Sequence, residues 1–401
     1  MPTGIRRIAT VVALAAAVPL SAGQVSRAQE PQAAPAVRTT AHALPGRYLV
    51  VLKDRTLPTR SVRAVSARLV RAYGGTVRRS FGAALKGWSA AMTADQAHRV
   101  AADPRVAYVE QDTAVRASGV QSDPPSWGLD RIDQRALPLD RSYRYPGTAD
   151  KVTAYVVDSG IRTSHTQFQG RAGVGADEVN DGKNGQDCAG HGTHVAGTIG
   201  GKDYGVAKGV KLVSVRVLNC RGTGSASSII AAADWITAHA ARPAVVNMSV
   251  NGPRNPSEDA AIEKSIAAGI TWVVSSGNDH ADACDNSPGD IAPALVVNNA
   301  TADDTRRADS DYGSCTDLFA PGTGIGSAWN TGDTATRSLT GTSMAAPHVT
   351  GAAALYLSVH PDASAAEVQG ALLDGATPDR IADAGKGTPN RLLHIGGPDA
   401  P

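Results

Sequence analysis

The sequence predicts an α/β fold: an open, mostly parallel sheet with helices on both faces, preceded by a small ferredoxin-like α+β module. From about Trp127 onward, runs dominated by Val, Ile and Leu alternate with helical stretches. Runs of this kind are typical of parallel strands that are buried on both faces. Ahead of them, about 70 residues show the order strand, helix, strand, strand, helix, strand, which predicts the small module.

Residues 1–28 are predicted to be a secretory signal. Arg6 and Arg7 precede an apolar run from Ile8 to Leu20, and small residues follow it. This run is shorter than the roughly 20 apolar residues that a membrane span needs, so we expect cleavage, after Ala28 or near Gly23. No later run is long enough to cross a bilayer. The sequence therefore predicts a secreted, extracellular protein with no membrane association once the signal is removed.

The rest of the chain divides into a basic and an acidic block. Residues 45–116 hold 13 basic and 5 acidic side chains, a net +8, whereas residues 117–401 hold 22 and 31, a net −9. The basic block lacks the interleaved aromatic residues and the motifs of nucleic-acid binders, so we expect no nucleic-acid partner. The charges instead predict that the two blocks attract each other. Residues 29–44, rich in Ala, Pro, Gln and Thr, are predicted to be a linker.

Composition and cysteine use agree with export. The 401-residue chain is 42% hydrophobic and 19% charged, which is typical of globular domains and excludes a disordered or collagen-like chain. Four cysteines suit an oxidising compartment, and none has the spacing of a zinc site, so we expect disulfides. These cysteines are Cys188, Cys220, Cys284 and Cys315. Four cysteines allow three pairings, and the residues alone leave all three open.

The basic block contains the elements of the small module. Residues 46–54, 87–92 and 106–112 are predicted strands, and residues 61–75 a helix that ends at a glycine pair. The apolar residues on one face of this helix are Val62, Val65, Leu69 and Tyr73. Thr93 and Gln96 form a capping-box pattern that opens a second helix, and Pro104 ends it.

Five runs of the acidic block are predicted to be strands of one sheet. They are "VTAYVVDSG", "VKLVSVRVL", "AVVNMSV", "ITWVVSSGND" and "ALVVNNAT". The predicted helices are "GTHVAGTIGG", "SASSIIAAADWITAHAA", "SEDAAIEKSIAAG" and the small, apolar "TSMAAPHVTGAAALYL". An open α/β sheet binds its ligands beyond the carboxyl ends of its strands.

Four polar side chains mark that edge of the predicted sheet. Asp158 ends the first of these strands and Asn278 the fourth, while His191 opens the first helix and Ser343 the last. An N-cap alone would explain a hydroxyl at the start of a buried helix, and Thr342 or Ser343 could supply it. The other polar residues at the same edge favour a chemical role.

Asp158, His191 and Ser343 supply the three roles that a serine nucleophile needs. A serine hydroxyl is a weak nucleophile at neutral pH and needs an adjacent base that a third group orients. Ser343 would attack a carbonyl, His191 would take and return the proton, and Asp158 would fix the tautomer of the ring. Asn278 and the backbone N–H of Ser343, at a helix N-terminus, would stabilise the oxyanion. No catalytic cofactor is expected.

The stretches around these residues resemble the conserved blocks of a known family. "VVDSGI", "GHGTHVAGTI", "SSGND" and "GTSMAAPHV" resemble the Asp, His, oxyanion-Asn and Ser blocks of the subtilisin-like serine proteases, in the order known for subtilisin itself. "WGLDRIDQRALPL", "YGVAKGVKLVSVRVLNC", "RPAVVNMS" and "GTPNRLL" are most similar to the proteinase K branch, and in it to the aqualysin-like enzymes. The likeness covers about residues 45–394. It implies that residues 117–401 form a peptidase domain that hydrolyses peptide bonds in proteins.

The resemblance also implies how the chain matures. Residues 45–116 would be a propeptide, acting as folding aid and inhibitor, and it would be removed by a cut between Arg116 and Ser122. Disulfides of aqualysin-like enzymes join cysteines placed like Cys188 with Cys220 and Cys284 with Cys315. The implied product is a secreted, monomeric serine endopeptidase of broad specificity, made as a self-processed zymogen.

Structural calcium is implied at two places. One site would use the carbonyls of Ala292 and Ala294 with the carboxylate of Asp317. The other would lie near the start of the peptidase domain and use Asp130, Asp133, Gln134, Asp140 and Ser142. Oxygen ligands suit this hard cation. The alternative at both places is a set of surface acids without an ion.

Two extended edges are implied to pair with a peptide substrate as added strands, which recognises backbone more than side chains. They are residues Gly222, Thr223 and Gly224, and residues Ser249, Val250 and Asn251. Ser275, Ser276 and Gly277 would form a wall of the primary specificity pocket. The family usually has Gly at position 251 and Ala-Ala-Gly at positions 275–277. The added bulk and polarity are expected to narrow the pocket or change its preference.

Two other functions are compatible with parts of the pattern. An esterase or lipase would use the elbow G-x-S-x-G, and "GTSMA" is one residue short of it. That fold places its acid and its histidine after the serine, whereas here both precede it. A secreted, inactive binding protein of the same fold is disfavoured because all four catalytic positions are filled.

Overall fold

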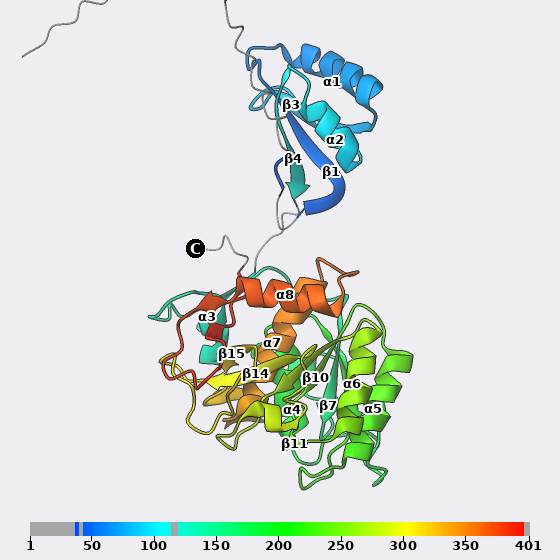
Figure 1. Ribbon diagram of the computed structural model, residues 1–401. Coiled ribbons are helices and arrows are strands. Elements are labelled where there is room, and N and C mark those ends of the chain that lie inside the picture. The colour runs from blue at the N-terminus through cyan, green and yellow to red at the C-terminus, as the bar shows by residue number, and fades with distance from the viewer. Residues whose placement is uncertain (1–36, 40–42, 114–118, 397–401) are drawn as a thin grey trace, which may run out of the picture. The chain divides into compact units, whose positions relative to one another are not determined.

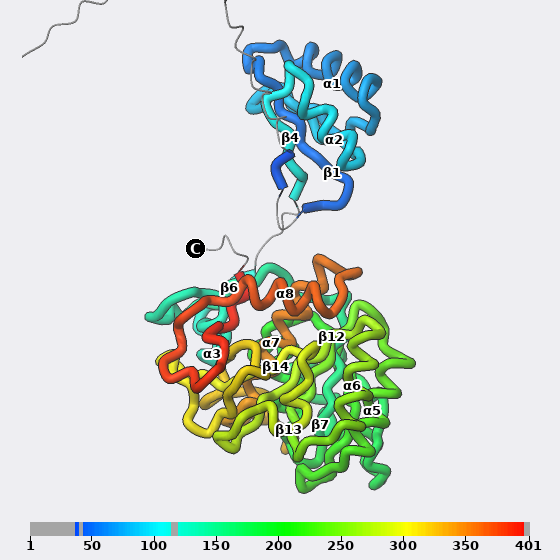
Figure 2. The backbone as a smooth tube through the Cα atoms, viewed as in Figure 1, coloured from blue at the N-terminus to red at the C-terminus, as the bar shows by residue number. Residues whose placement is uncertain are grey.

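The computed structural model describes residues 37–39, 43–113 and 119–396. The chain divides into two units, Met1–Val115 and Arg116–Pro401, and each is described by itself (Figures 1 and 2). The predicted signal, residues 1–28, lies outside the described residues. So do residues 29–36 and 40–42 of the predicted linker and residues 114–118, where the predicted processing segment begins.

The N-terminal unit is a four-stranded antiparallel sheet with two helices. Its elements are β1 (Ala43–Leu52), α1 (Thr59–Tyr73), β2 (Thr76–Phe81), β3 (Gly87–Ala91), α2 (Ala94–Ala101) and β4 (Val106–Thr113). The strand order β2-β3-β1-β4 is that of a ferredoxin-like module, which confirms the predicted fold of this unit.

Local signals in the basic block explain these elements. Leu69 of α1, Val100 of α2 and Trp88 of β3 are at most 1% exposed and share one apolar cluster. The predicted capping box opens α2, because Gln96 N donates to Thr93 Oγ1 and Thr93 N donates to Gln96 Oε1.

The predicted linker is structured toward its end. β1 already begins at Ala43, and Arg38 pairs with β4 through a hydrogen bond from its backbone N–H to Val109 O at 2.9 Å. The composition of residues 29–44 did not reveal this pairing, because backbone hydrogen bonds form whatever side chains the paired residues carry.

The C-terminal unit is built on a sheet whose described strands have the order β18-β19-β15-β14-β12-β10-β7-β9-β8. Every neighbouring pair is parallel except β18 with β19. In chain order the strands are β7 (Thr153–Asp158), β8 (Ala172–Asp177), β9 (Lys211–Arg216), β10 (Ala244–Met248), β12 (Thr271–Ser275), β14 (Leu295–Ala300), β15 (Leu318–Pro321), β18 (Thr377–Pro378) and β19 (Arg391–Leu392). The five strands predicted from apolar runs are β7, β9, β10, β12 and β14.

Helices and short ribbons surround this sheet. The helices are α3 (Trp127–Ile132), α4 (His191–Gly200), α5 (Ala226–His239), α6 (Pro256–Ala267), α7 (Thr342–Leu357) and α8 (Ala365–Gly375), with single turns at Thr166–Phe168 and Ala283–Asp285. Three two-stranded ribbons pair β5 (Gly119–Ser122) with β6 (Ser142–Tyr145), β11 (Gly252–Pro253) with β13 (Asn286–Ser287), and β16 (Ile325–Ala328) with β17 (Thr336–Leu339). Among the described residues no helix is long and apolar enough to cross a membrane.

Two apolar clusters place helices on both faces of the sheet, as predicted. α4 and α7 pack in one cluster, and α5 and α6 pack in the other, where Figure 1 shows them side by side in green. Along β7, Val156 belongs to the first cluster and Val157 to the second. This is the alternation expected of a strand that is buried on both sides.

Helix α7 runs through the first cluster. All of its residues are buried except Ser343 in its first turn and Tyr356 near its end. Its N-cap is Gly341, and no side chain caps it. The capping explanation for the hydroxyls of Thr342 and Ser343 is therefore wrong.

Candidate active site

The carboxyl edge of the sheet brings four of the predicted residues to neighbouring elements. Asp158 is the last residue of β7, and Asn278 follows the end of β12. His191 is the first residue of α4, and Ser343 lies in the first turn of α7. Helices α4 and α7 pack against each other, so residues that are distant in sequence meet at this edge.

Asp158 and His191 form a buried pair. His191 Nδ1 lies 2.8 Å from both carboxylate oxygens of Asp158, which is 0% exposed, while the imidazole side chain is 29% exposed. Burial lowers the pKa of His191, but the charge and hydrogen bond of Asp158 outweigh it, and the pKa lies above its ordinary value. The carboxylate thus fixes the ring and makes Nε2 the nitrogen available to a nucleophile.

A second carboxylate, Asp187, organises the start of α4. It accepts from the backbone N–H groups of Ala189, Gly190 and Thr193 and from the hydroxyls of Ser159 and Thr193. These bonds satisfy N–H groups that a helix start leaves without partners. The sequence analysis missed this residue. Its signal is an Asp just ahead of the helix that carries the histidine, as in a helix cap.

Ser343 exchanges two hydrogen bonds with Ser249, the residue that follows β10. Its hydroxyl donates to Ser249 O at 3.2 Å, and Ser249 Oγ donates to Ser343 O at 3.0 Å. The second bond has a local cause: Pro347, four residues on, has no N–H to offer the Ser343 carbonyl. In this pose the hydroxyl does not donate to His191, and such catalytic bonds commonly tighten only when substrate binds.

A buried polar chain supports Ser249 from below. Thr350 Oγ1 donates to Asn247 Oδ1 at 2.8 Å, and Asn247 Nδ2 donates to Ser249 Oγ at 2.9 Å. Thr350 and Asn247 are 0% exposed. Because every link has a partner, this chain fixes the position of the Ser343 backbone at little cost in unsatisfied polar groups.

Asn278 presents its amide nitrogen beside the backbone of Ser343. Its Oδ1 accepts from Thr342 N at 2.8 Å and from Thr342 Oγ1 at 3.1 Å. A Cβ placed on Gly341 would lie 3.8 Å from both Asn278 Nδ2 and Ser343 N, so both nitrogens lie beside Gly341. Two N–H donors that converge on one point can hold a negatively charged oxygen.

Of the two predicted substrate edges, the one at Ser249 contacts Ser343. Gly222, Thr223 and Gly224 are exposed, in a turn that Asn219 supports. At the other edge, Asn251 Nδ2 donates to Ser275 O at 2.7 Å, and Ser275 Oγ donates to Asn251 Oδ1 at 2.6 Å. This reciprocal pair joins the segments that follow β10 and β12. Ser276 Oγ is buried and has no hydrogen-bond partner among the described residues.

Comparison with known proteins agrees with this geometry. The pattern of the subtilase family matches residues 149–396. The chain belongs to the subtilase family. The pattern of the peptidase inhibitor I9 family matches residues 47–118, so this subtilase carries an inhibitor-type propeptide unit ahead of its peptidase unit.

Individual relatives cover both units. An extracellular serine proteinase of Thermus sp. (strain Rt41A) is 49% identical over 88% of this chain and 90% of its own length. Alkaline serine exoprotease A of Vibrio alginolyticus is 42% identical over 79% of this chain and 61% of its own length. The crystal structure of a cold-adapted subtilisin-like serine proteinase matches with a TM-score of 0.66 at 45% identity, over 68% of this chain and 98% of that one. This subtilase is a serine proteinase, a hydrolase acting on peptide bonds.

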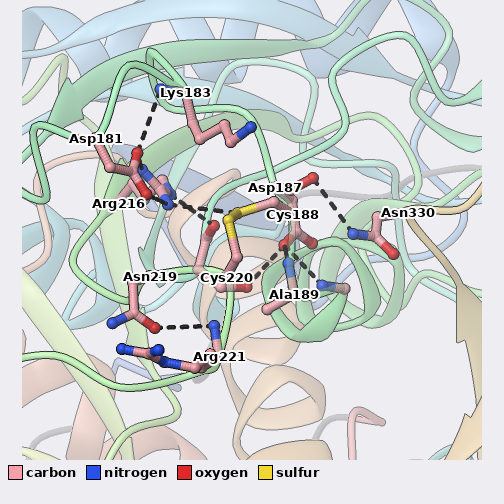
Figure 3. Close-up of a disulfide and its surroundings, with 12 residues drawn as sticks. Asp181, Lys183, Asp187, Cys188, Ala189, Arg216, Asn219, Cys220, Arg221 and Asn330 are labelled. Atoms are coloured by element: carbon pink, nitrogen blue, oxygen red, sulfur yellow. Dashed lines mark hydrogen bonds and ion pairs between the residues drawn. A yellow bond between two sulfur atoms is a disulfide. The ribbon is translucent and has the colours of Figure 1, made fainter.

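The structure of this subtilase contains two disulfides, Cys188–Cys220 and Cys284–Cys315, the pairs that the resemblance implied. Figure 3 shows the first beside the fully buried guanidinium of Arg216, which pairs with Asp181 and reaches Cys188 Sγ at 3.4 Å. This disulfide connects the segment just before His191 to the segment just before Gly222, where a substrate edge is predicted. The described residues contain one cluster of three side chains of the types that can bind a metal ion. It consists of Asp181 and these two cysteines. The sulfurs are oxidised, so the group is not a metal site.

The first implied calcium set fits a cation. The carbonyls of Ala292 and Ala294 converge, because Gln369 Nε2 donates to both, at 3.3 and 3.0 Å. Burial raises the pKa of Asp317 to about 6, although the N–H of Val296 and the charge of Arg391 oppose the shift. Two converging carbonyls and a buried carboxylate are hard oxygen donors, and Gln369 would turn away when an ion binds.

The second implied set fits less well. Asp133 Oδ1 is buried without a partner, and burial raises the pKa of Asp133 to about 6, which would suit an ion. Asp130, however, already accepts the backbone N–H groups of Asp140 and Arg141, and Asp140 pairs with Arg144 at 2.8 Å. Gln134 Nε2 donates to two nearby carbonyls. The second site, which includes Ser142, stays a prediction.

Proposed function

We propose that this subtilase is a secreted endopeptidase of broad specificity, made as a self-processed zymogen, with Asp158, His191 and Ser343 as its catalytic triad and Asn278 as the side-chain donor to the oxyanion. The observation that carries the proposal is the pairing of His191 Nδ1 with the buried Asp158 at the edge where Ser343 is partly exposed. Secretion is inferred from the predicted signal and from the relative named as extracellular.

The proposed roles are those of a serine protease triad. Ser343 Oγ attacks the carbonyl carbon of the peptide bond while His191 Nε2 takes the hydroxyl proton. Asn278 Nδ2 and Ser343 N hold the oxyanion. The intermediate collapses, His191 gives its proton to the leaving amine, and water then hydrolyses the acyl-enzyme with His191 again as base.

The substrate backbone is proposed to add a strand to each of two edges. Gly222–Gly224 offers an exposed turn and Ser249–Asn251 follows β10, so main-chain hydrogen bonds supply most of the recognition. This explains a broad specificity. The Asn251–Ser275 pair joins the segment that follows β10 to the end of β12, and it is proposed to narrow the pocket for the side chain next to the cleaved bond.

Structural calcium is proposed at the first set, where Ala292 and Ala294 offer carbonyls and Asp317 a carboxylate. A chelator should lower the melting temperature of the Ser343→Ala protein, and Asp317→Asn should remove most of that response. A melting temperature that the chelator does not move would contradict the proposal.

The precursor offers a direct test of the catalytic assignment. We expect the Ser343→Ala precursor to keep residues 29 to about 118 and to show no activity on casein, whereas a Ser338→Ala control matures normally. Normal self-processing of Ser343→Ala would refute the assignment. Hydrolysis of tributyrin without hydrolysis of casein by the wild type would favour the esterase alternative.

A further inference from the structure

We propose that Asp311 is a positioning residue for the oxyanion site, acting through the turn that carries Asn278. The inference rests on the proposed role of Asn278. Asp311 touches neither that side chain nor Ser343 in any contact of the described residues. It contacts the peptide groups on both sides of Asn278.

Both oxygens of the buried Asp311 carboxylate accept hydrogen bonds. It is 1% exposed, and its Oδ1 accepts from Asp279 N and Ala281 N, each at 2.9 Å. Its Oδ2 accepts from Asn286 Nδ2 at 3.1 Å. The N–H groups of Asp279 and Ala281, two residues apart in the turn, thus share one carboxylate oxygen of Asp311.

The backbone of Asp311 holds the other side of Asn278. Asp311 N donates to Gly277 O at 3.1 Å, directly before Asn278, while the carboxylate holds Asp279 N directly after it. Neighbouring bonds continue the pairing, from Tyr312 N to Ala281 O and from His280 N to Asp309 O. The segment around Asp311 therefore fixes the Cα of Asn278 from both sides.

Gly277 shows how closely the carboxylate approaches. A Cβ on Gly277 would lie 2.0 Å from Asp311 Oδ2, and the φ of Gly277 is +118°. Both facts require glycine directly before Asn278. The position of Asn278 is thus set by a close fit between a glycine and a buried carboxylate.

This placement matters for rate more than for binding. The donor must meet an oxygen that is charged only in the transition state, so a displaced Asn278 lowers kcat and leaves KM nearly unchanged. A misplacement of about 1 Å can cost about 10²-fold.

A double-mutant cycle on the full-length protein separates positioning from general stability. We expect Asp311→Ala to lower kcat for a peptide anilide about 10²-fold, with KM changed less than about threefold. Turnover is normalised to the serines that react with an irreversible probe. In an Asn278→Ala background the same change should cost less than about threefold, because the group that Asp311 positions is gone.

The conservative variant is expected to rescue. In Asp311→Asn the remaining oxygen can still accept both N–H groups, and only the bond from Asn286 Nδ2 is lost. We expect kcat within about fivefold of wild type. Asp304→Asn, at a buried carboxylate that pairs with Arg131, is the control, and its effect should be equal in both backgrounds.

The possible results distinguish the two proposals. An Asp311→Ala loss that is the same with and without Asn278 would overturn the positioning role. An Asn278→Ala protein with full turnover would instead refute the proposed oxyanion role itself. If Asp311→Ala is not secreted, Asp311→Ser, which reaches at most one of the two N–H groups, replaces it in the same cycle.

Discussion

His191 lies against a buried carboxylate with its ring partly exposed, and this position decides its titration. Its pKa is raised because the charge of Asp158, with a smaller contribution from Asp187, outweighs the burial of the ring. The ring acts as a base only when it is neutral. Activity is therefore present above this raised pKa and is lost as the pH falls through it.

Asp158→Asn tests this balance. The change removes the charge that raises the pKa of His191, so the acidic limb of kcat/KM should move to lower pH. Turnover should also fall by on the order of 10⁴-fold, since the wrong tautomer is stabilised. The measurement is a pH profile of peptide hydrolysis, and an acidic limb that stays in place would contradict the account.

The Asn251–Ser275 pair yields a prediction about specificity. Asn251→Gly removes both hydrogen bonds that join the two segments, so the pocket should open to larger side chains. The ratio of kcat/KM for Phe against Ala before the cleaved bond should rise about tenfold. Asn184→Gly, at an exposed position outside the site, is the matched control. An unchanged ratio would show that the pair does not limit the pocket.

Residues that react could be recognised in the sequence, whereas residues that position others could not. Asp158, His191 and Ser343 each end a strand or open a helix in a motif with its own spacing. Asp187 leaves only one weak signal, an Asp just ahead of the helix that carries His191, and Asp311, which accepts N–H groups of a turn about 30 residues away in the chain, leaves none. Pro347 likewise leaves the carbonyl of Ser343 without its helical N–H partner, and the sequence does not show that the hydroxyl of Ser249 takes this place.

At the scale of elements, long apolar runs were the reliable signal. The five predicted strands and the helices α4 to α7 are all present. β8, whose six residues include two glycines and only one valine, and β15, with four residues, were missed because neither forms a long apolar run. α8 opens with a Ser364–Glu367 capping box that was overlooked.

Helix α6 has an internal electrostatic weakness. Asn255 caps it, but Glu258 in its first turn is 5% exposed, and burial together with Asp259 and Asp290 raises its pKa to about 7. Because the folded state favours the protonated form, the stability that Glu258 contributes is complete below its ordinary pKa of 4.5. It is lost as the pH rises toward 7.

Glu258→Gln should remove this dependence. At pH 8 the variant should be more stable by on the order of 3 kcal/mol, and near pH 4 the two proteins should be equal. Urea unfolding of the Ser343→Ala protein, which avoids self-digestion, provides the measurement. Glu263→Gln, an exposed change on the same helix, is the control. Equal stabilities at pH 8 would contradict the burial argument.

At the scale of the whole molecule, the chain consists of two units of opposite charge. The division between Val115 and Arg116 lies within one residue of the predicted boundary at 116 and 117. Composition could indicate this because the charge changes sign there. Composition could not indicate the fold of either unit, since net charge carries no information about shape.

Charge attraction between the units should be sensitive to salt. Raising the salt concentration from about 0.01 to 1 M shortens the Debye length from about 30 to 3 Å. The inhibition constant of the 45–116 segment against the mature enzyme should therefore rise by roughly tenfold or more. A small active-site inhibitor, tested in parallel, controls for salt effects on the enzyme. An inhibition constant that does not change with salt would show that charge attraction does not contribute to inhibition.

The central claim is that His191 activates Ser343. A radiolabelled organophosphorus reagent specific for activated serines should place one label per chain, on the peptide that contains Ser343. Labelling should be lost in denatured protein and nearly lost in His191→Ala. Label on another serine, or labelling of Ser343 at an undiminished rate without the imidazole, would contradict the account.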